Sequence, residues 1–205
     1  MDIDPSLLAK ADNYQLLTNL VVPRPIAWVS TVNREGLVNL APFSFFNAVC
    51  ADPLYVAISI GHRDSGAPKD TAVNIERCGE FVVNLVTEEL LEAMNISAAD
   101  FPPEQSELPA AGLFVTPSLR VKPPRLLRAQ ASLECSLFQA VPLGVNTLYI
   151  GEVLMFHVAD VLLGPRLHID HFAPIGRLGS PSVYCRTTDR IELARVTCDP
   201  SQRRY

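Results

Sequence analysis

The sequence lacks the features that mark several large classes of protein. No apolar run reaches the roughly 18 to 20 residues needed to span a bilayer. The opening MDIDPSLLAKAD carries acids where a secretory signal peptide carries bases. Lysine and arginine are scattered along a chain of formal net charge -5, so the basic field that nucleic acid requires is missing. We therefore expect a cytoplasmic protein that binds neither membranes nor nucleic acid.

Cysteine is scarce and irregularly spaced. The five cysteines form no CxxC pair and no even framework, which favours reduced thiols over disulfides. Cys50 is expected to be a buried small hydrophobic residue, as free cysteines commonly are. His168 and His171 in the stretch HIDH have no third ligand at a helpful spacing, and Asp170 is expected to point elsewhere. We predict a solvated loop there and no metal site.

Familiar nucleotide-binding and nucleophile motifs are also missing. No GxGxxG follows the first predicted strand, and the chain contains neither a Walker A sequence nor a GxSxG motif. The sequence therefore predicts neither a Rossmann domain nor the chemistry of a P-loop NTPase or an α/β-hydrolase.

The chain does contain a series of strand-like segments. Its 205 residues suffice for one domain with a substantial core. Strands and helices do not alternate regularly, which argues against a doubly wound sheet and favours a mainly β, antiparallel barrel with short helices outside it. The first twenty residues suit a short helix or an irregular lead-in. Further along, we expect a β-hairpin at 24–42, strands at 54–60, 80–87, 128–141 and 147–163, helices at 70–79 and 88–97, and a proline-rich surface excursion at 97–125.

The segment SFFN, residues 44–47, follows directly on a predicted strand. A serine, two phenylalanines and an asparagine offer a hydroxyl, flat apolar faces, an amide and backbone N–H groups. A phosphorylated planar heterocycle needs such groups. A strand end that buries two phenylalanines in the core is an equally good interpretation, and the residues alone leave both open.

The segment KDT, residues 69–71, stands at the start of a predicted helix. Lys69 offers a positive charge, Thr71 a hydroxyl, and the helix N-terminus offers free N–H groups and the positive end of a dipole. This combination suits a phosphate group. The alternative is an ordinary helix cap, supplied by Asp70 or Thr71.

Two further positions have a structural and a functional interpretation. On the first strand, Trp28 and Ser30 share one face, because residues two apart in a strand point the same way. A lone tryptophan is more often a core residue than a cofactor contact. His157, in the strand MFHVADV, is expected to be a satisfied, half-buried histidine, and a contact with a cofactor edge or with another subunit is the alternative.

These residues together resemble a known family. The string PRPIAWVSTVNREGLVNLAPFSFFNAVCADP resembles the opening of the flavin reductase-like, FMN-binding split-barrel family. The branch includes flavoredoxins and the reductase component of nitrilotriacetate monooxygenase. The match continues through KDTAVNIERCGEFVVNLV and EELLEAMN, and resumes at VKPPR, NTLYIGEVLMFHV and PIGRLGSPSVY. The resemblance covers nearly the whole chain, and RPIAWVST with NLAPFSFFN is its most specific part.

The resemblance implies a fold and a site. It implies one FMN-binding domain over residues 1–205, a six-stranded antiparallel split barrel with Greek-key character, and a homodimer with FMN at the subunit interface. Where family members often carry GRLGGxxY, this chain has GRLGSPSVY, and Pro181 stiffens the loop. The implied phosphate contacts are Ser44, Phe45, Lys69 and Thr71; the implied ring contacts are Trp28, Ser30, Thr31 and Asn47; and Arg177 and Tyr184 are the residues implied to reach the partner's flavin.

The resemblance also implies an activity. Hydride passes from NADH or NADPH to FMN, a step that requires no side-chain acid or base, so no catalytic residue is predicted. The reduced flavin then leaves, or its electrons pass to a redox partner or an oxygenase. Two alternatives share the same pocket: a flavoredoxin-type electron carrier with little nicotinamide activity, and a flavin-binding module without turnover.

Overall fold

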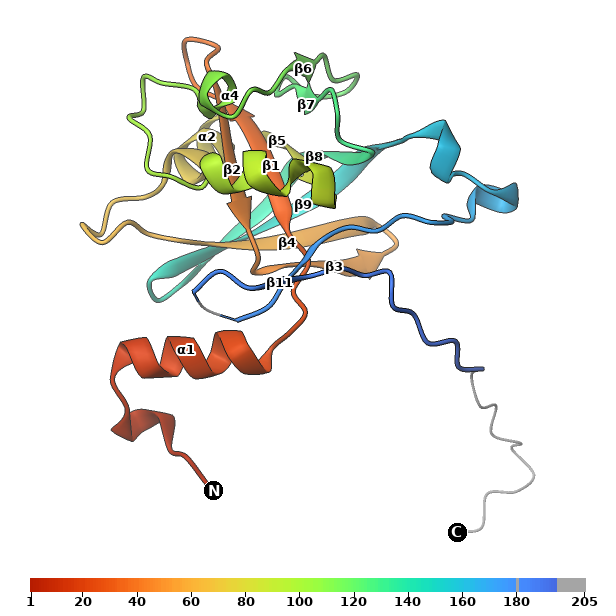
Figure 1. Ribbon diagram of the computed structural model, residues 1–205. Coiled ribbons are helices and arrows are strands. Elements are labelled where there is room, and N and C mark those ends of the chain that lie inside the picture. The colour runs from red at the N-terminus through yellow and green to blue at the C-terminus, as the bar shows by residue number, and fades with distance from the viewer. Residues whose placement is uncertain (180, 195–205) are drawn as a thin grey trace.

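The computed structural model describes residues 1–179 and 181–194, and its main element is a seven-stranded antiparallel sheet (Figure 1). The strand order is β2-β1-β5-β8-β9-β4-β3, so neighbours such as β1 and β5 are not consecutive in the chain. β8 and β9 form the longest hairpin. The strands are β1 (Ala27–Val32), β2 (Val38–Phe43), β3 (Phe46–Ala51), β4 (Leu54–Gly61), β5 (Glu80–Leu85), β8 (Ala131–Leu143) and β9 (Asn146–Val158).

The two edges of this sheet are joined by a sharp bend in the chain. β2 and β3 are the edge strands, yet only Ser44 and Phe45 separate them. The amide of Ser59 in β4 donates to the carbonyl of Phe45 over 2.8 Å, so the bend stays attached to the sheet. The sheet therefore curls into a split barrel, and the predicted fold class is confirmed. Seven strands appear where six were expected, because the residues after the bend form an additional edge strand, β3.

Short helices and two small hairpins surround the barrel. The predicted helices at 70–79 and 88–97 are confirmed, and Gly79 ends the first of them in the left-handed conformation, with φ 69°. The helices are α1 (Lys10–Leu20), α2 (Asp70–Cys78), α3 (Leu91–Ile96) and α4 (Glu107–Ala110), with 3-10 turns at Pro5–Leu7, Glu88–Leu90, Asp160–Leu162 and Pro165–Leu167; the hairpins pair β6 (Val115–Thr116) with β7 (Arg125–Leu126) and β10 (Gly176–Arg177) with β11 (Tyr184–Cys185).

Both faces of β1 are buried, in two separate apolar clusters. Val29 faces the barrel interior, where it belongs to the same cluster as Phe81 and Tyr149. Trp28 faces the other way and packs in a second cluster that includes Met94 of α3. The alternation of a strand places these side chains on opposite faces, and α3 covers the second face. β1 is consequently covered on both faces rather than forming one wall of an open cleft.

α1 lies on the outside of the barrel, below the sheet in the view of Figure 1. Its apolar residues Tyr14, Leu17 and Leu20 are exposed. Arg24 anchors its C-terminal end, because the guanidinium donates to the carbonyls of Thr18 and Val21, at 2.5 and 2.8 Å. Within the described residues, no helix is both long enough and apolar enough to cross a membrane.

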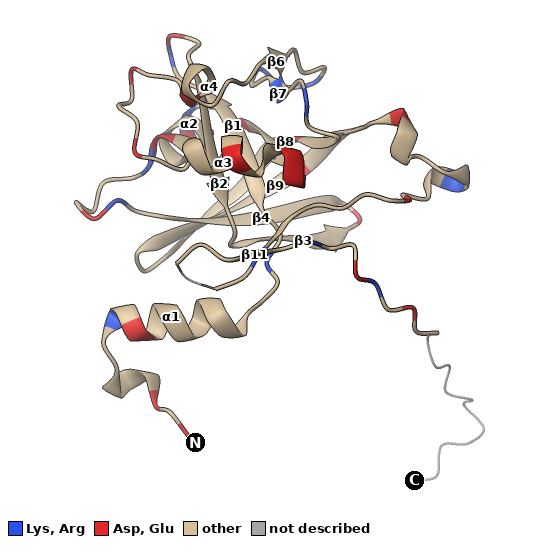
Figure 2. Ribbon diagram, in the orientation of Figure 1, with Lys and Arg blue, Asp and Glu red and all other residues tan. Residues whose placement is uncertain are grey.

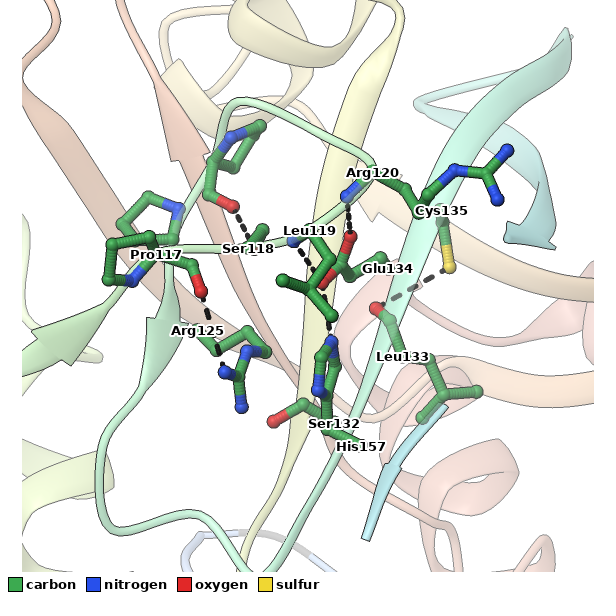
Figure 3. Close-up of polar contacts among 12 residues, drawn as sticks. Pro117, Ser118, Leu119, Arg120, Arg125, Ser132, Leu133, Glu134, Cys135 and His157 are labelled. Carbon is green, nitrogen blue, oxygen red and sulfur yellow. Dashed lines mark hydrogen bonds and ion pairs between the residues drawn. The ribbon is translucent and has the colours of Figure 1, made fainter. Parts of the chain in front are cut away.

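A buried carboxylate holds the proline-rich excursion against the barrel (Figure 3). Glu134 of β8 is fully buried and accepts hydrogen bonds from the amides of Leu119 and Arg120, at 2.8 and 2.6 Å. His157 of β9 contacts the same carboxylate at 2.5 Å, so this histidine is the satisfied, half-buried residue that we predicted. Burial alone would raise the pKa of Glu134, but these hydrogen bonds outweigh it, and the pKa lies below its ordinary value.

Two local expectations from the sequence are wrong. Cys50 is exposed, because it lies on the edge strand β3, whereas Cys135 is the cysteine inside the barrel. Asp170 does not point away from the histidines: its Oδ1 atom lies 3.1 Å from Nε2 of His168. Among the residues that the structure describes, no cluster of three or more histidines, cysteines or carboxylates could hold a metal ion. Cys198 lies outside the described residues.

Candidate functional site

Three pockets adjoin one another around the bend between β2 and β3. The first, named the α2 pocket, has a volume of about 70 Å³ and lies at the start of α2. The second, the bend pocket, has a volume of about 270 Å³ and shares Pro42, Phe43 and Ala98 with the first. The third, the Asn47 pocket, has a volume of about 370 Å³ and shares Ser44 with the second. Of the predicted site residues, Lys69 and Thr71 line the α2 pocket, Ser44, Arg177 and Tyr184 line the bend pocket, and Ser44, Phe45 and Asn47 line the Asn47 pocket.

The start of α2 leaves one cation of the α2 pocket without an acidic partner. Lys69 is the N-cap residue and makes no side-chain capping bond, which corrects the expectation that Asp70 or Thr71 caps the helix. Asp70 instead pairs with Arg63 at 2.5 Å, and Asp100 lies 3.7 Å from the same guanidinium. Among the described residues, no carboxylate lies within ion-pair distance of Lys69. Charges of both signs thus crowd the loop leading into α2 (Figure 2), and Lys69 stays available to an anion.

The hydroxyl of Thr71 is held in place from β2. The side-chain amide of Asn39 donates to Thr71 Oγ1 over 2.9 Å. Thr71 itself is almost completely buried. Because Oγ1 already accepts from Asn39, the hydroxyl proton remains free to donate into the α2 pocket.

A buried glutamate of α4 also lines the α2 pocket, and no pattern in the sequence pointed to it. Glu107 is 5 % exposed, and its Oε2 atom accepts a hydrogen bond from the backbone amide of Leu40 over 2.8 Å. Burial raises the pKa of Glu107, and the negative charge of Asp70 adds to the rise, while the Leu40 amide acts in the opposite direction. The pocket therefore combines a free cation with a carboxyl group that tends toward its neutral form.

Arg24 organises the bend itself, and sequence reasoning missed it. Its Nε atom donates to Ser44 Oγ at 3.3 Å, and its guanidinium lies 5.9 Å from the centre of the Phe45 ring. Its backbone exchanges two hydrogen bonds of 2.8 Å with Arg177. The side chain also donates to the carbonyl of Leu178 over 2.8 Å. Arg24 thus ties the bend to the β10–β11 hairpin that forms the far wall of the bend pocket.

Arg177 and Tyr184 form a pair within this hairpin. The guanidinium of Arg177 donates to the hydroxyl of Tyr184 over 2.7 Å and lies 4.8 Å from the centre of its ring. A second donor of Arg177 reaches the carbonyl of Pro181, also at 2.7 Å. Pro181 therefore takes part in fixing the arginine that lines the bend pocket.

Three of the predicted ring contacts do not fit this geometry. Trp28, Ser30 and Thr31 have no exposed surface. Trp28 donates to Ser97 Oγ, Ser30 donates to the carbonyl of Pro124, and Thr31 accepts from an asparagine amide of α2. All three lie on β1, which is covered on both faces, so we leave them out of the site proposed below. Trp28 reaches the pockets indirectly, through Ser97, which lines the α2 pocket, and through its cluster neighbours Ile26 and Met94, which line the bend pocket.

A family model, a related sequence and two solved structures each match most of this chain. The model of the family described as Flavin reductase like domain matches residues 19–192. A protein of Aquifex aeolicus is 45 % identical over 168 residues, which cover 81 % of this chain and 86 % of that relative. The structure of nitrilotriacetate monooxygenase component B from Bacillus cereus has a TM-score of 0.90 and 37 % identity, over 94 % of this chain and 98 % of that one. The structure of a 2-nitrobenzoate 2-nitroreductase from Pseudomonas fluorescens has a TM-score of 0.88 and 38 % identity, over 98 % and 100 % of the two chains.

Proposed function

The chain belongs to the family of flavin reductase like domains, and from that premise we propose that it is a cytoplasmic, NAD(P)H-dependent FMN reductase. The observation that carries the proposal is the continuity of two unlike pockets. A small pocket at the start of α2, where Lys69 has no acidic partner among the described residues, adjoins a larger pocket with aromatic walls and shares three lining residues with it. A flavin monophosphate has the same two parts, a compact anionic group and a flat apolar ring.

The residues of the α2 pocket fit a phosphate group. Lys69 supplies a positive charge without an acidic partner, Thr71 supplies a hydroxyl proton, and the first turn of α2 supplies N–H groups that no side chain caps. We propose FMN as the cofactor, because this cation, hydroxyl and helix start can bind its single phosphate group.

The residues of the bend fit a flavin ring. Phe43 and Tyr184 offer flat apolar surface in the bend pocket, and Ser44 offers a hydroxyl between that pocket and the Asn47 pocket. Phe45 and the amide of Asn47 line the Asn47 pocket and complete the proposed set. Arg177 is held beside the ring site by Tyr184 and Pro181. Trp28 supports this wall from beneath rather than touching the ligand.

The chemistry divides between cofactor and protein. When bound, FMN supplies the acceptor for a hydride from a nicotinamide. The polar side chains that line the bend pocket, among them Ser44, Arg177 and Tyr184, can orient a bound ring by hydrogen bonds. The protein's part is to anchor the phosphate with Lys69 and to keep the ring against Phe43 and Tyr184.

We include a homodimer in the proposal. The exposed apolar residues Tyr14, Leu17 and Leu20 of α1 are unusual for a helix that remains in solvent. Leu17 and Val21 also line the Asn47 pocket, next to the bend. A second copy packed against α1 would cover this surface beside the flavin site. Sedimentation of the purified protein tests this part: a monomer at micromolar concentration would contradict it.

The purified protein distinguishes the reductase from its alternatives. We expect added FMN to stimulate oxidation of NADH or NADPH, with electrons passing to free flavin, a redox partner or an oxygenase. Retention of FMN through gel filtration with slow nicotinamide turnover would favour an electron carrier of the flavoredoxin type. Binding of FMN without reduction by either nicotinamide would indicate a flavin-binding module. Failure to bind FMN would contradict the proposal as a whole.

A second candidate activity is nitroaromatic reduction. The 2-nitroreductase of Pseudomonas fluorescens shares 38 % identity with this chain over nearly the whole length of both. The Asn47 pocket, with apolar residues such as Pro25 and Phe46, offers room for an aromatic acceptor beside the bend. Consumption of 2-nitrobenzoate by the FMN-loaded protein with a nicotinamide donor would support this candidate, and the absence of consumption would remove it.

A further inference from the structure

We propose that Glu107 is a specificity-determining residue of the α2 pocket, and that its carboxylate takes up one proton from solvent when a phosphate group enters. The inference rests on the proposed function, because it concerns the site assigned to the FMN phosphate. It adds a proton to the binding equilibrium and makes the affinity for phosphorylated flavin depend on pH.

The geometry places the carboxyl group at the pocket with little contact with water. Glu107 begins α4, and its side chain covers the edge strand β2, where Oε2 accepts the Leu40 amide. The residue is almost completely buried and lines the same pocket as Lys69 and Thr71. Glu107 is therefore a titratable residue of the pocket lining that is largely shielded from bulk solvent.

The charges around Glu107 make an additional anion costly while the carboxylate is ionised. Arg63, from the loop before α2, is already paired with Asp70 of α2 and lies near Asp100, from the segment between α3 and α4. Lys69 is the remaining cation of the lining, and an ionised Glu107 would offset it. The other polar groups at this place come from β2: the Leu40 amide and the side chain of Asn39, which bonds to Thr71.

Protonation removes this conflict and supplies a donor. A neutral Glu107 no longer repels phosphate, and its O–H group can donate to a phosphate oxygen. Burial and Asp70 already raise the pKa of Glu107. A bound phosphate acts in the same direction as Asp70, because a second negative charge further disfavours the ionised carboxylate. Riboflavin, which lacks the phosphate, produces no such shift.

Calorimetric titration of the purified protein tests the inference. FMN and riboflavin are titrated between pH 6 and 9 in pairs of buffers that differ in ionisation enthalpy, which gives the number of protons taken up. We expect FMN binding to the unmodified protein to be accompanied by the uptake of as much as one proton more than FMN binding to Glu107→Gln. Riboflavin binding should show no such difference between the two proteins. Glu104→Gln, on an exposed residue of the same segment, is the matched control and should behave like the unmodified protein. Equal uptake by the unmodified protein and Glu107→Gln throughout this range would overturn the inference.

A second measurement needs no variant, in case Glu107→Gln does not fold. The ratio of FMN affinity to riboflavin affinity should fall by as much as roughly tenfold per pH unit above neutrality, because uptake of one proton gives that slope. Ionisation of the FMN phosphate itself is nearly complete in that range. A ratio that does not change with pH would contradict the role of Glu107. Failure of both flavins to bind would contradict the proposed function instead.

Discussion

The indole nitrogen of Trp28 donates a hydrogen bond to Ser97 Oγ over 2.9 Å, and this bond joins the buried strand β1 to the wall of the α2 pocket. Ser97 Oγ in turn donates to the carbonyl of Met94 at the end of α3. The next residue, Ala98, lines both the α2 pocket and the bend pocket. A core residue thus determines the shape of the surface on which we place the flavin.

This relationship predicts the effect of Trp28→Phe. The substitution keeps an aromatic ring but removes the donor to Ser97, and we expect a loss of about 1–3 kcal/mol in the free energy of unfolding. The absorption maxima of bound flavin should not move, because Trp28 has no surface in the pockets. Urea denaturation and a spectrum of the FMN complex measure the two effects. A shifted spectrum with unchanged stability would show that Trp28 contacts the ring after all.

Lys69→Ala tests the phosphate assignment. Removal of a charged donor should weaken FMN binding by roughly 1–3 kcal/mol, and riboflavin binding should hardly change. Fluorescence titration of both flavins gives the comparison. Lys122→Ala serves as the control, because Lys122 has an exposed side chain outside the three pockets. Equal losses for FMN and riboflavin would argue that Lys69 supports the pocket without binding phosphate.

Arg24→Met tests the anchor of the bend. The guanidinium donates to Ser44 Oγ and to the carbonyls of Thr18, Val21 and Leu178. Because these acceptors lose their partner, we expect the free energy of unfolding to fall by roughly 2–4 kcal/mol. Urea denaturation measures the change.

The control for Arg24 is Arg34→Met, on an exposed turn residue. It removes the same charge and should leave stability within roughly 0.5 kcal/mol of the unmodified protein. Similar losses for both variants would mean that the effect comes from net charge and not from the contacts of Arg24.

The buried carboxylate of Glu134 predicts a pH dependence of stability. Its pKa is lower in the folded protein than its ordinary value of 4.5, so the unfolded chain binds the proton more tightly. The stabilisation is therefore present at neutral pH and is lost as the pH falls below about 4.5 and through the lower folded value. Urea denaturation of the unmodified protein and Glu134→Gln should show a stability gap at pH 7 that narrows on acidification. A gap of constant size would contradict this explanation, and Glu35→Gln, on an exposed residue, should show no gap.

The sequence predicted the strands and helices that are determined by residues close together in the chain. The first hairpin follows from its NREG turn, and the end of α2 follows from Gly79, the left-handed residue that closes it. β3 was missed, because FNAVCA lacks the alternation of a half-buried strand and its residues are mostly exposed.

The parts of the site that escaped prediction depend on distant contacts. Glu107 acts on Leu40, 67 positions away, and Arg24 reaches Leu178 across 154 positions. Alternation along β1 correctly put Trp28 and Ser30 on one face, but it could not show that α3 and the proline-rich excursion cover that face. The resemblance implied Ser44 and Phe45 as phosphate contacts and Asn47 as a ring contact beside the β1 residues, and burial separates these three from β1.

Anaerobic mixing of the FMN-loaded protein with NADH or NADPH tests the central claim most directly. The flavin absorbance should bleach after mixing with at least one of the two nicotinamides. The flavin bound to Lys69→Ala, loaded with FMN to the same extent, should bleach at a similar rate, because Lys69 binds the phosphate and takes no part in hydride transfer. A bound flavin that stays oxidised with both nicotinamides, and bleaches only with dithionite, would contradict the assignment as an NAD(P)H-dependent reductase.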